Sequence, residues 1–370
     1  MALAAALLST SCATEPEVRA SGTPSSTPPS PARLAREAAL TSAIVWVPPA
    51  VPVAQADLGS NPGDDPRFSP DAPLHCRFVR DRVGGTTPKF YCELPDGERV
   101  KVKYGTGNPE LPAEVAASRL LAALGFPADR MFVVGGVTCE GCPRFPFQAL
   151  RCHQRTGAES VCFMGTDSRD TVRFPFAVIE RRLEGRVLES FEDEGWAWYE
   201  LDRIDPARGG SSRAHVDAFR LMARLLAHWD NKSQNQRLVC RPSDERPGGA
   251  CAAPLAIMQD LGATFGPLKI DWHNWTRDRI WKDRAACAIS MEHMPWGGGT
   301  FPEVRISEAG RQLLTELLEQ LSVSQLRRLF DGARVTTHDQ VRAAGRSADA
   351  WISTFLDKVE QIKTAGPCPR

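Results

Sequence analysis

Short runs of alternating apolar and polar residues open the structured part of the chain. Arg77–Arg82, Lys89–Leu94 and Arg99–Tyr104 alternate in this way, and Gly-Gly and Pro-Asp-Gly turns separate them. Since strand side chains point to opposite faces in turn, this pattern predicts three short strands. A helix is expected next, from Pro112 near its start to a stop at Gly125.

Further along, the apolar period changes from that of strands to that of helices. Met131–Val134 and Phe174–Ile179 are two more strand candidates, and His215–Trp229 repeats apolar residues at helical spacing. Two short strands are expected around Val239 and at Ala256–Met258. The end of the chain has the pattern of successive helices: Ser307–Leu321, Ser324–Phe330, Thr337–Ala344 and Ala348–Lys363.

This order of elements predicts an α+β protein with two lobes. The β-rich N-terminal lobe is expected over residues 71–182 and the helical C-terminal lobe over residues 183–370. The chain holds 45 Lys and Arg and 45 Asp and Glu. This balance favours neither a nucleic acid nor an anionic membrane surface as the partner.

Residues 1–12 form an apolar run that ends in Ser-Cys, which is typical of a bacterial lipoprotein signal. Cys12 would then be lipidated, and the membrane would be reached only through that anchor. No Lys or Arg precedes the run, so a frayed terminus or a wrongly assigned start codon is the alternative. Residues 13–70 are expected to form a disordered tether, at 13–38, and a proline-broken strap at Ala43–Val53. No later segment has the roughly 20 apolar residues that a membrane span needs.

Ten further cysteines support export, because most fall in close pairs that suit an oxidising compartment. The local pairs leave Cys287 and Cys368 over. The connectivity stays open, except that the turn-rich segment Arg241–Ala250 predicts a disulfide between Cys240 and Cys251. The close pairs are Cys76/Cys92, Cys139/Cys142, Cys152/Cys162 and Cys240/Cys251. The alternative is a zinc site made by Cys139, Cys142, Cys152 and His153. An extracytoplasmic protein, either an envelope lipoprotein or a secreted one, is the favoured interpretation.

The segment His228–Asn235 carries the strongest chemical signal. Asp230 is followed by Lys232 and then by Asn235, directly after the amphipathic helix. In phosphoryl transfer an Asp takes the proton of the acceptor hydroxyl, a Lys neutralises the migrating group, and an Asn supplies an oxygen ligand to Mg²⁺. The alternative is a capped, solvated loop.

A second motif follows at Ile257–Gly262, where an apolar strand ends in Asp-Leu-Gly. Asp260 stands where a kinase places the carboxylate that binds the metal between the nucleotide phosphates. Gly262 allows the backbone to turn sharply beneath that metal. Two such motifs in this order predict a site for ATP with Mg or Mn.

The loop between the first two strands is a candidate phosphate cover. Gly84, Gly85 and Thr86 lie in it, and Lys89 opens the next strand. An ordinary hairpin turn is the alternative.

Lys101 and Lys103 point to the same face of the third strand. Lys103 is the preferred phosphate ligand because it precedes the exit toward the helix. Glu114, in the first turn of that helix, is its candidate ion-pair or metal partner, unless it is only a carboxylate favoured by the helix dipole.

With these motifs the chain resembles the secretory-pathway atypical kinases, which phosphorylate secreted proteins or the xylose of proteoglycan linkers. The Gly84–Thr86 loop, the Ala113–Leu121 helix and the Asp-Leu-Gly turn carry the resemblance. It implies a protein-kinase-like fold in which Lys103 binds phosphate, Glu114 and Asp260 bind metal, and Asp230 is the catalytic base. Asn235 departs from that group, in which an acidic residue is usual.

Three functions follow as hypotheses. The first is an ATP- and metal-dependent phosphotransferase for an extracytoplasmic protein or glycan acceptor. The second is a catalytically silent kinase-like scaffold. The third is a glycan-binding protein that uses its tryptophans, for which core packing is the alternative. These are Trp196, Trp198, Trp272, Trp275 and Trp281.

Overall fold

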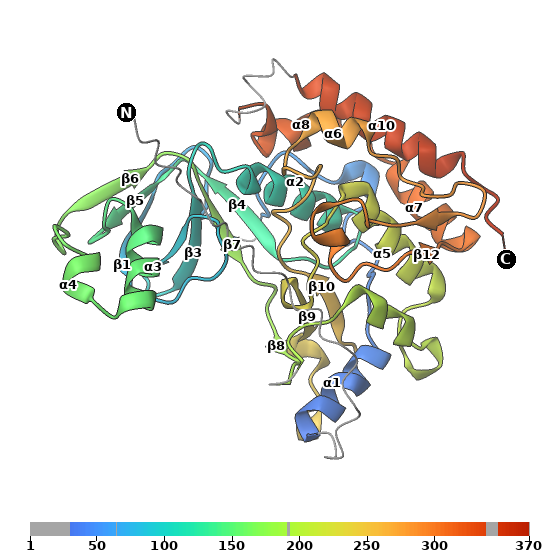
Figure 1. The fold of residues 1–370 in the computed structure, drawn as a ribbon, viewed down its shortest axis with the longest axis horizontal. Helices are drawn as coiled ribbons and strands as arrows, with labels where there is room; N and C mark the ends of the chain where they lie inside the picture. The colour runs from blue at the N-terminus through green and yellow to red at the C-terminus, as the bar shows by residue number, and fades with distance from the viewer. Residues whose placement is uncertain (1–29, 64, 191–192, 338–346, 370) are drawn as a thin grey trace, which may run out of the picture.

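The computed structural model describes residues 30–63, 65–190, 193–337 and 347–369. The expected signal segment, Cys12 and most of the expected tether lie outside the described residues, as does most of the helix expected at Thr337–Ala344. The described chain forms a sheet-rich lobe and a helical lobe, with helix α2 (Glu110–Ala123) between them (Figure 1). The two-lobed α+β architecture predicted from the sequence is confirmed.

One sheet organises the N-terminal lobe. Its strand order within the described residues is β4-β7-β3-β2-β1-β5-β6, and only the pairing of β1 with β5 is parallel. The strands are β1 (Leu74–Val79), β2 (Lys89–Glu93), β3 (Arg99–Tyr104), β4 (Arg130–Val134), β5 (Val137–Glu140), β6 (Thr171–Phe174) and β7 (Ala177–Arg181). Two helices that the sequence patterns did not reveal cover one end of the sheet, α3 (Pro146–Thr156) and α4 (Glu159–Cys162) (Figure 1).

The prediction of one strand at Phe174–Ile179 is wrong in detail, because these residues are divided between β6 and β7. The two residues between the strands are Pro175 and Phe176. Proline has no backbone N–H to donate to a strand partner, so it ends a strand that an apolar pattern alone would continue.

Helix α5 (Arg213–Leu226) is the centre of the C-terminal lobe and packs mainly against α7 (Glu308–Leu318). Phe219, Met222, Leu225 and Leu226 are buried, as their helical spacing predicts. The other elements are β8 (Arg186–Val187), β9 (Gln236–Cys240), β10 (Leu255–Met258), α6 (Trp272–Arg277), β11 (Ala288–Ile289), β12 (Val304–Arg305), α8 (Val323–Gly332) and α10 (Ala348–Lys363).

The described end of the expected tether is ordered, which corrects the prediction. Residues 31–41 form helix α1 (Pro31–Thr41), with Ser30 as its N-cap. Arg36 is buried and donates to the carbonyl of Gly195 and to the carboxylate of Glu200. The low apolar content of this segment suggested a tether, but a buried ion pair and Leu40, which is fully buried, hold the helix in place.

The segment after α1 is an extended strap, as its prolines suggest. Ile44 bridges to Leu255 at the end of β10, and the amide of Val47 donates to the carbonyl of Gly125 at the end of α2. Farther along, the side chain of Gln325 donates to the carbonyl of Val53. The strap therefore contacts α2, β10 and α8 and joins the interlobe helix to the C-terminal lobe.

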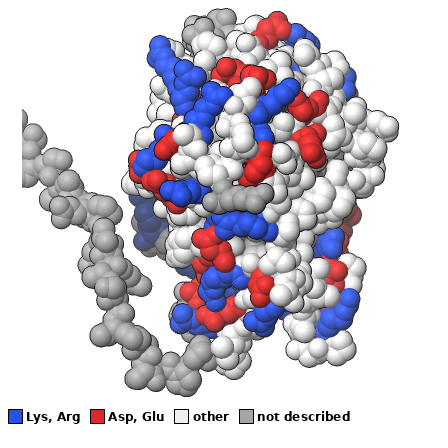
Figure 2. Space-filling model, turned by 90° about the vertical axis from the view of Figure 1, so that its right-hand side faces the viewer, with Lys and Arg blue, Asp and Glu red and all other residues white. Residues whose placement is uncertain are grey.

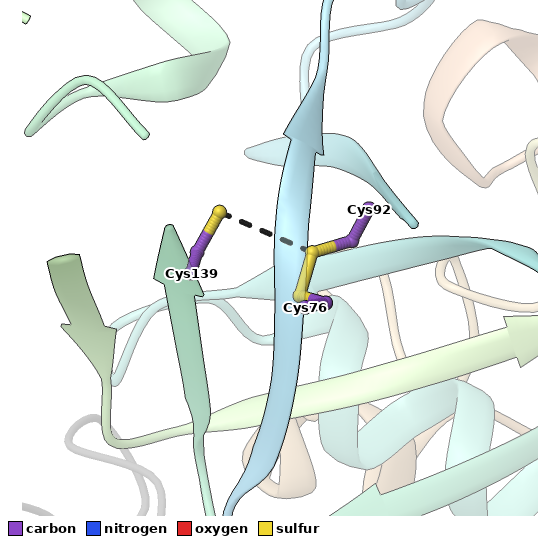
Figure 3. Close-up of side chains that lie close together, drawn as sticks. All are labelled: Cys76, Cys92 and Cys139. Carbon is purple, nitrogen blue, oxygen red and sulfur yellow. Dashed lines mark hydrogen bonds between the residues drawn. A yellow bond between two sulfur atoms is a disulfide. The ribbon is translucent and has the colours of Figure 1, made fainter. Parts of the chain in front are cut away.

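Five disulfides pair ten cysteines: Cys76–Cys92, Cys139–Cys142, Cys152–Cys162, Cys240–Cys251 and Cys287–Cys368. Figure 3 shows that Cys139 lies beside the Cys76–Cys92 bridge, with 3.9 Å between the sulfur atoms of Cys92 and Cys139. The zinc alternative is therefore wrong, because its three cysteines are held in disulfides and have no thiolate to offer a metal.

The surface carries charges of both signs. Figure 2 shows basic and acidic side chains interspersed over the helical side of the molecule. None of the helices in the described part combines the length and the apolar composition that crossing a membrane requires.

The two disulfides of the C-terminal lobe should differ in their contribution to stability. Cys287–Cys368 spans 81 residues and Cys240–Cys251 spans 11. A longer loop restricts the unfolded chain more, by about 2 kcal/mol for these two lengths in the chain-entropy model. We therefore expect Cys287→Ser with Cys368→Ser to lower the free energy of unfolding by about 2 kcal/mol more than Cys240→Ser with Cys251→Ser. Urea unfolding of the two double variants measures this, and equal losses would contradict it.

Candidate functional site

Lys103 on β3 is a deeply buried charge beside helix α2. Its side chain is 2% exposed and forms ion pairs with Glu114 on α2 and with Glu180 on β7, the latter at 2.9 Å. Burial opposes the charge of Lys103, but these two carboxylates outweigh it and raise its pKa well above the usual range. The strand and helix patterns thus bring together the predicted pair, Lys103 and Glu114.

Glu180 is a member of this cluster that sequence reasoning missed. It also contacts Lys101, so it joins the two lysines of β3. Burial alone would raise its pKa, but Lys103 and Lys101 lower it to about 2. The available signal was weak, since a lone Glu in the apolar strand Ala177–Arg181 indicates a buried carboxylate without naming its partner.

Lys89 lies across the strand pair from Lys103, its register partner. It is buried, and among the described residues no hydrogen bond or ion pair holds its ammonium group. Burial and the charge of Lys103 both lower its pKa. A Cβ added at Gly85 would lie 3.4 Å from Lys89 Nζ, so the ammonium lies directly beneath the glycine loop. A buried cation in this position suits an anionic ligand held under the loop.

The glycine loop is exposed at Gly84, Gly85 and Thr86. Gly85 has a φ of +66°, which an L side chain adopts only with strain. The next residue, Thr87, is buried, and its hydroxyl contacts the carboxylate of Glu110 at the start of α2. The loop is therefore anchored at one end and open to solvent at its tip.

The segment that carries Asp230 begins where α5 ends. Ala227 ends the helix in the left-handed region with a φ of +52°, and the chain then turns through His228 to Asp230. The Asp230 side chain is 35% exposed and lies 3.6 Å from Lys232 Nζ. Asn235 donates from its side-chain nitrogen to the Asp230 carbonyl at 2.6 Å, which closes the loop.

The two chemical motifs are joined through Asn235. Its backbone carbonyl accepts from the amides of Gln259 and Asp260 at 3.0 and 3.3 Å. This contact continues the pairing of β9 with β10, in which Gln236 faces Met258. Cys240 and Cys251 close the other end of the same strand pair. The 25 residues between the motifs therefore fold back, and Asp230, Asn235 and Asp260 are brought into one region.

Asp260 is partly buried beneath α2, and its Oδ1 accepts from the Gly262 amide at 3.3 Å. Burial would raise its pKa, but Lys103 and Lys89 together hold the pKa below the usual range. Glu114 shows the opposite result. Burial raises its pKa to about 8, aided by Asp260 and opposed by Lys103. Two neighbouring carboxylates thus differ strongly in proton affinity, a pattern that is common at functional sites.

The residues fit a divalent metal ion on one direct observation. Glu114 is fully buried, and its Oε2 atom has no hydrogen-bond partner within the described residues. A buried carboxylate oxygen without a partner carries a large desolvation cost, which a cation would offset. Carboxylate and amide oxygens are the ligands that Mg²⁺ and Mn²⁺ take, and Glu114, Asp260 and Asn235 supply both kinds.

A cavity of about 590 Å³ adjoins this cluster. Lys101 and Glu180 line it from the sheet, and Arg237 on β9 lines it from the C-terminal lobe. The link between the lobes, Arg181–Gly185, forms its edge. Its size falls in the range of cofactor sites. Because Glu180 contacts both Lys101 in the cavity wall and Lys103 in the cluster, the two sites are continuous.

A second cavity, of about 490 Å³, opens between the glycine loop and the start of α2. Lys269, nine residues after Asp260, lines it and contacts Glu110. Glu110 therefore holds Thr87 of the glycine loop on one side and Lys269 of the C-terminal lobe on the other. Sequence analysis identified neither Glu110 nor Lys269, because their pairing spans 159 residues.

The tryptophans proposed for sugar stacking are not available for it. Trp196, Trp198 and Trp275 are fully buried, Trp281 is 9% exposed, and Trp272 is partly buried. Core packing, the alternative at the sequence level, explains them.

No protein-family model matches the chain, and no curated protein matches it significantly. Among solved structures, the chain is similar to the Helicobacter pylori proinflammatory kinase CtkA, with 10% identity and a TM-score of 0.40, over 79% of this chain and 96% of that one. It is also similar to a Golgi casein kinase with Mn/ADP bound, with 13% identity and a TM-score of 0.36, over 80% of this chain and 73% of that one. The function is inferred below from the side chains of this chain alone.

Replacing Gly262 should damage the carboxylate cluster. A Cβ there would lie 2.9 Å from Glu110 Cγ and 3.0 Å from Glu114 Oε1. We expect Gly262→Ala to lower the free energy of unfolding by about 1–3 kcal/mol and to reduce the stabilisation produced by Mn²⁺. Thermal unfolding with and without Mn²⁺ measures both. Gly63→Ala, where nothing lies within 4 Å of the added Cβ, is the matched control and should behave as wild type.

His228 should make the protein sensitive to acid. It is fully buried, and burial lowers its pKa from 6.5 to about 4. The unfolded chain therefore takes up a proton before the folded chain does, so stability is complete above pH 6.5 and is lost as the pH falls toward 4. At pH 4.5 the loss due to this group should be about 2–3 kcal/mol.

The measurement for His228 is urea unfolding at pH 7 and pH 4.5. The difference between the two free energies should shrink in His228→Gln and stay unchanged in His273→Gln, which replaces an exposed histidine. An unchanged difference in His228→Gln would show that this histidine is already charged in the folded protein.

Proposed function

We propose that this chain is an ATP-dependent phosphotransferase that uses Mg²⁺ or Mn²⁺ and acts on a protein or glycan acceptor outside the cytoplasm. The observation that supports it best is the buried cluster of Lys103, Glu114 and Asp260, tied through Asn235 to the partly exposed Asp230. A purely structural core would not place three titratable groups and a carboxyl oxygen without a hydrogen bond between two lobes.

The nucleotide would span the interlobe cavity and the cluster. Its base fits the cavity of about 590 Å³, and its phosphates would reach Lys103 and Lys89 beneath the glycine loop. Lys89, buried and without an ion-pair partner among the described residues, gains a counter-charge when phosphate binds. The ammonium groups of Lys89 and Lys103 together would therefore bind an anion.

Glu114, Asp260 and Asn235 would hold the metal. A metal held there would supply charge neutralisation at the phosphates in addition to that of the two lysines. Glu114, whose pKa is about 8, would release its proton as it becomes a ligand.

Asp230 would act on the acceptor. Its exposed carboxylate accepts the proton of the acceptor hydroxyl while the oxygen bonds to the terminal phosphorus and ADP leaves with the electrons of the broken P–O bond. Lys232, 3.6 Å away and 56% exposed, would neutralise the phosphoryl group during transfer. The acceptor would come from the solvent side, because the Asp230 side chain is partly exposed, while Asn231 and Asn235 hold the backbone of its turn.

Location outside the cytoplasm is supported by five disulfides, since reducing compartments do not preserve such bonds. Attachment through Cys12 to a membrane lipid is part of the same proposal. The alternative function is a silent scaffold of the cell envelope with the same fold.

The test compares two aspartates with different roles. We expect Asp260→Asn to abolish nucleotide binding, because it removes a metal ligand. Asp230→Asn should leave binding within about twofold of wild type but lower turnover by at least about 1,000-fold, because the base acts only in the transition state. Calorimetric titration with ATP, in Mn²⁺ and in EDTA, and transfer of radiolabel to envelope extracts measure the two quantities.

If the wild-type protein binds ATP in Mn²⁺ but transfers label to no acceptor, and Asp230→Asn behaves in the same way, the enzyme hypothesis fails and the silent scaffold is supported. Equal binding in EDTA would contradict the metal site. Loss of nucleotide affinity in Asp230→Asn would show that this carboxylate belongs to the metal site instead.

A further inference from the structure

The feature that carries the inference is a glycine-rich loop beside the catalytic segment. The loop is the 3-10 turn Pro295–Gly298 and the two residues after it, and it presents Trp296 to solvent. Trp296 is 81% exposed, whereas every other tryptophan of the chain is buried or partly buried. Burial of an indole ring contributes strongly to stability, so the exposure of the Trp296 ring to solvent requires a functional explanation.

The loop is held rigidly rather than left free. Trp296 has a φ of +58° in the left-handed region, and each of the three glycines that follow it also has a positive φ. For a residue with a bulky side chain this conformation costs on the order of 1 kcal/mol, and it persists only where neighbouring contacts impose it.

Those contacts come from the segment that carries Asp230. The side-chain oxygen of Asn231 accepts from the Thr300 amide at 2.8 Å, and the Asn231 carbonyl accepts from the Thr300 hydroxyl at 2.7 Å. A Cβ at Gly299 would lie 2.6 Å from the Asn231 side-chain oxygen. The loop is thus fixed to the residue next to the catalytic base, and Trp296 lies only four residues before that attachment.

A second exposed aromatic residue, Tyr199, follows a residue that is also hydrogen-bonded to Thr300. The Trp198 amide donates to the Thr300 hydroxyl at 3.1 Å, and the next residue, Tyr199, is 60% exposed. Trp198 itself is buried, so the same short turn anchors one ring in the core and presents the other. Tyr199 and Trp296 therefore both lie near Thr300, which contacts Asn231 beside Asp230.

We propose that Trp296 is the acceptor-recognition platform of the enzyme and that it stacks on the pyranose ring of a glycan. This inference rests on the proposed function and names its substrate class. It goes beyond the sequence hypothesis, whose five tryptophans are all buried or partly buried.

The surroundings of Trp296 favour a sugar over a protein. Along the segment 290–305, all of it described, Trp296 is the one large apolar side chain that is exposed, so the ring is not part of a continuous exposed apolar run of the chain. Its near neighbours along the chain, Glu292, His293 and Glu303, are polar and exposed. A flat apolar face surrounded by hydrogen-bonding groups matches a pyranose, which has apolar C–H faces and a rim of hydroxyls.

The geometry also explains why the ring must be rigid. Stacking fixes the sugar, and an acceptor hydroxyl must then be held near Asp230 within hydrogen-bond reach. Because the loop is attached to Asn231, a shift of the platform is also a shift of the catalytic segment. Trp296 is in this sense a specificity residue that selects the acceptor without taking part in the chemistry.

The test titrates wild-type protein with neutral hexasaccharides of glucose, xylose, galactose, mannose and N-acetylglucosamine, and with a serine-rich peptide. The titrations are made without nucleotide, by calorimetry and by saturation-transfer NMR. We expect at least one hexasaccharide to bind. Trp296→Ala should weaken that binding at least about tenfold, whereas Trp296→Phe, which keeps an aromatic face, should stay within about threefold.

The control variant is Phe145→Ala, which removes another exposed aromatic ring, 60% exposed, from the N-terminal lobe and should leave saccharide binding unchanged. Affinity for ATP with Mn²⁺ should be the same in all variants, which also shows that they are folded. The platform is overturned if no hexasaccharide binds, if binding survives Trp296→Ala, or if the peptide alone binds through Trp296.

The two proposals fail separately. If saccharides bind through Trp296 but no acceptor is phosphorylated, the sugar-site proposal is supported and the enzyme proposal is contradicted. If label is transferred to envelope proteins but no saccharide binds, the enzyme proposal is supported and the sugar-site proposal is contradicted.

Discussion

Lys103 is an ammonium group that is 2% exposed, at the place where the sheet, helix α2 and the link to the C-terminal lobe meet. A charge buried this deeply is tolerated only if opposite charges surround it. Glu114 comes from α2 and Glu180 from β7, so satisfying one lysine fixes the position of the helix against two strands. The position of α2 on the sheet follows from this requirement.

The same cluster is not balanced within itself. Lys89 is buried without an ion-pair partner among the described residues, and one oxygen of Glu114 has no hydrogen bond. One ammonium group and one carboxyl oxygen are therefore left without partners, and a phosphate and a metal ion are the ligands that would complement them. Stability is given up at the site, and the disulfides and the ordered strap of the surrounding fold compensate for the loss.

The C-terminal lobe delivers the chemical groups by means of backbone contacts. Asn235 uses its backbone carbonyl to hold Asp260 and its side chain to hold the turn at Asp230, so one residue sets the spacing between the proposed base and the proposed metal ligand. Asn231 plays the corresponding part on the acceptor side, where it fixes the loop of Trp296. Both asparagines are buried, and both act through hydrogen bonds that only a short amide side chain can make here.

The sequence by itself determined what depends on near neighbours. The alternation of β2 and β3, the buried stripe of α5 and the spacing within residues 228–235 are local patterns, and local backbone preferences express them wherever the chain folds. Lys103 could be chosen over Lys101 for the same reason, since its place at the strand end sets it against the start of α2. The disulfide of Cys240 with Cys251 also follows from a short, turn-rich loop.

Only the tertiary structure decided which groups meet across long stretches of chain. Glu180 reaches Lys103 from another strand, Glu110 reaches Lys269 across 159 residues, and Arg36 reaches Glu200 across 164. No sequence pattern identifies which polar residues will pair at such separations, because these contacts form only after the core has formed. The same holds for Trp296, whose exposure is set by three glycines and a distant asparagine rather than by its own position in an apolar pattern.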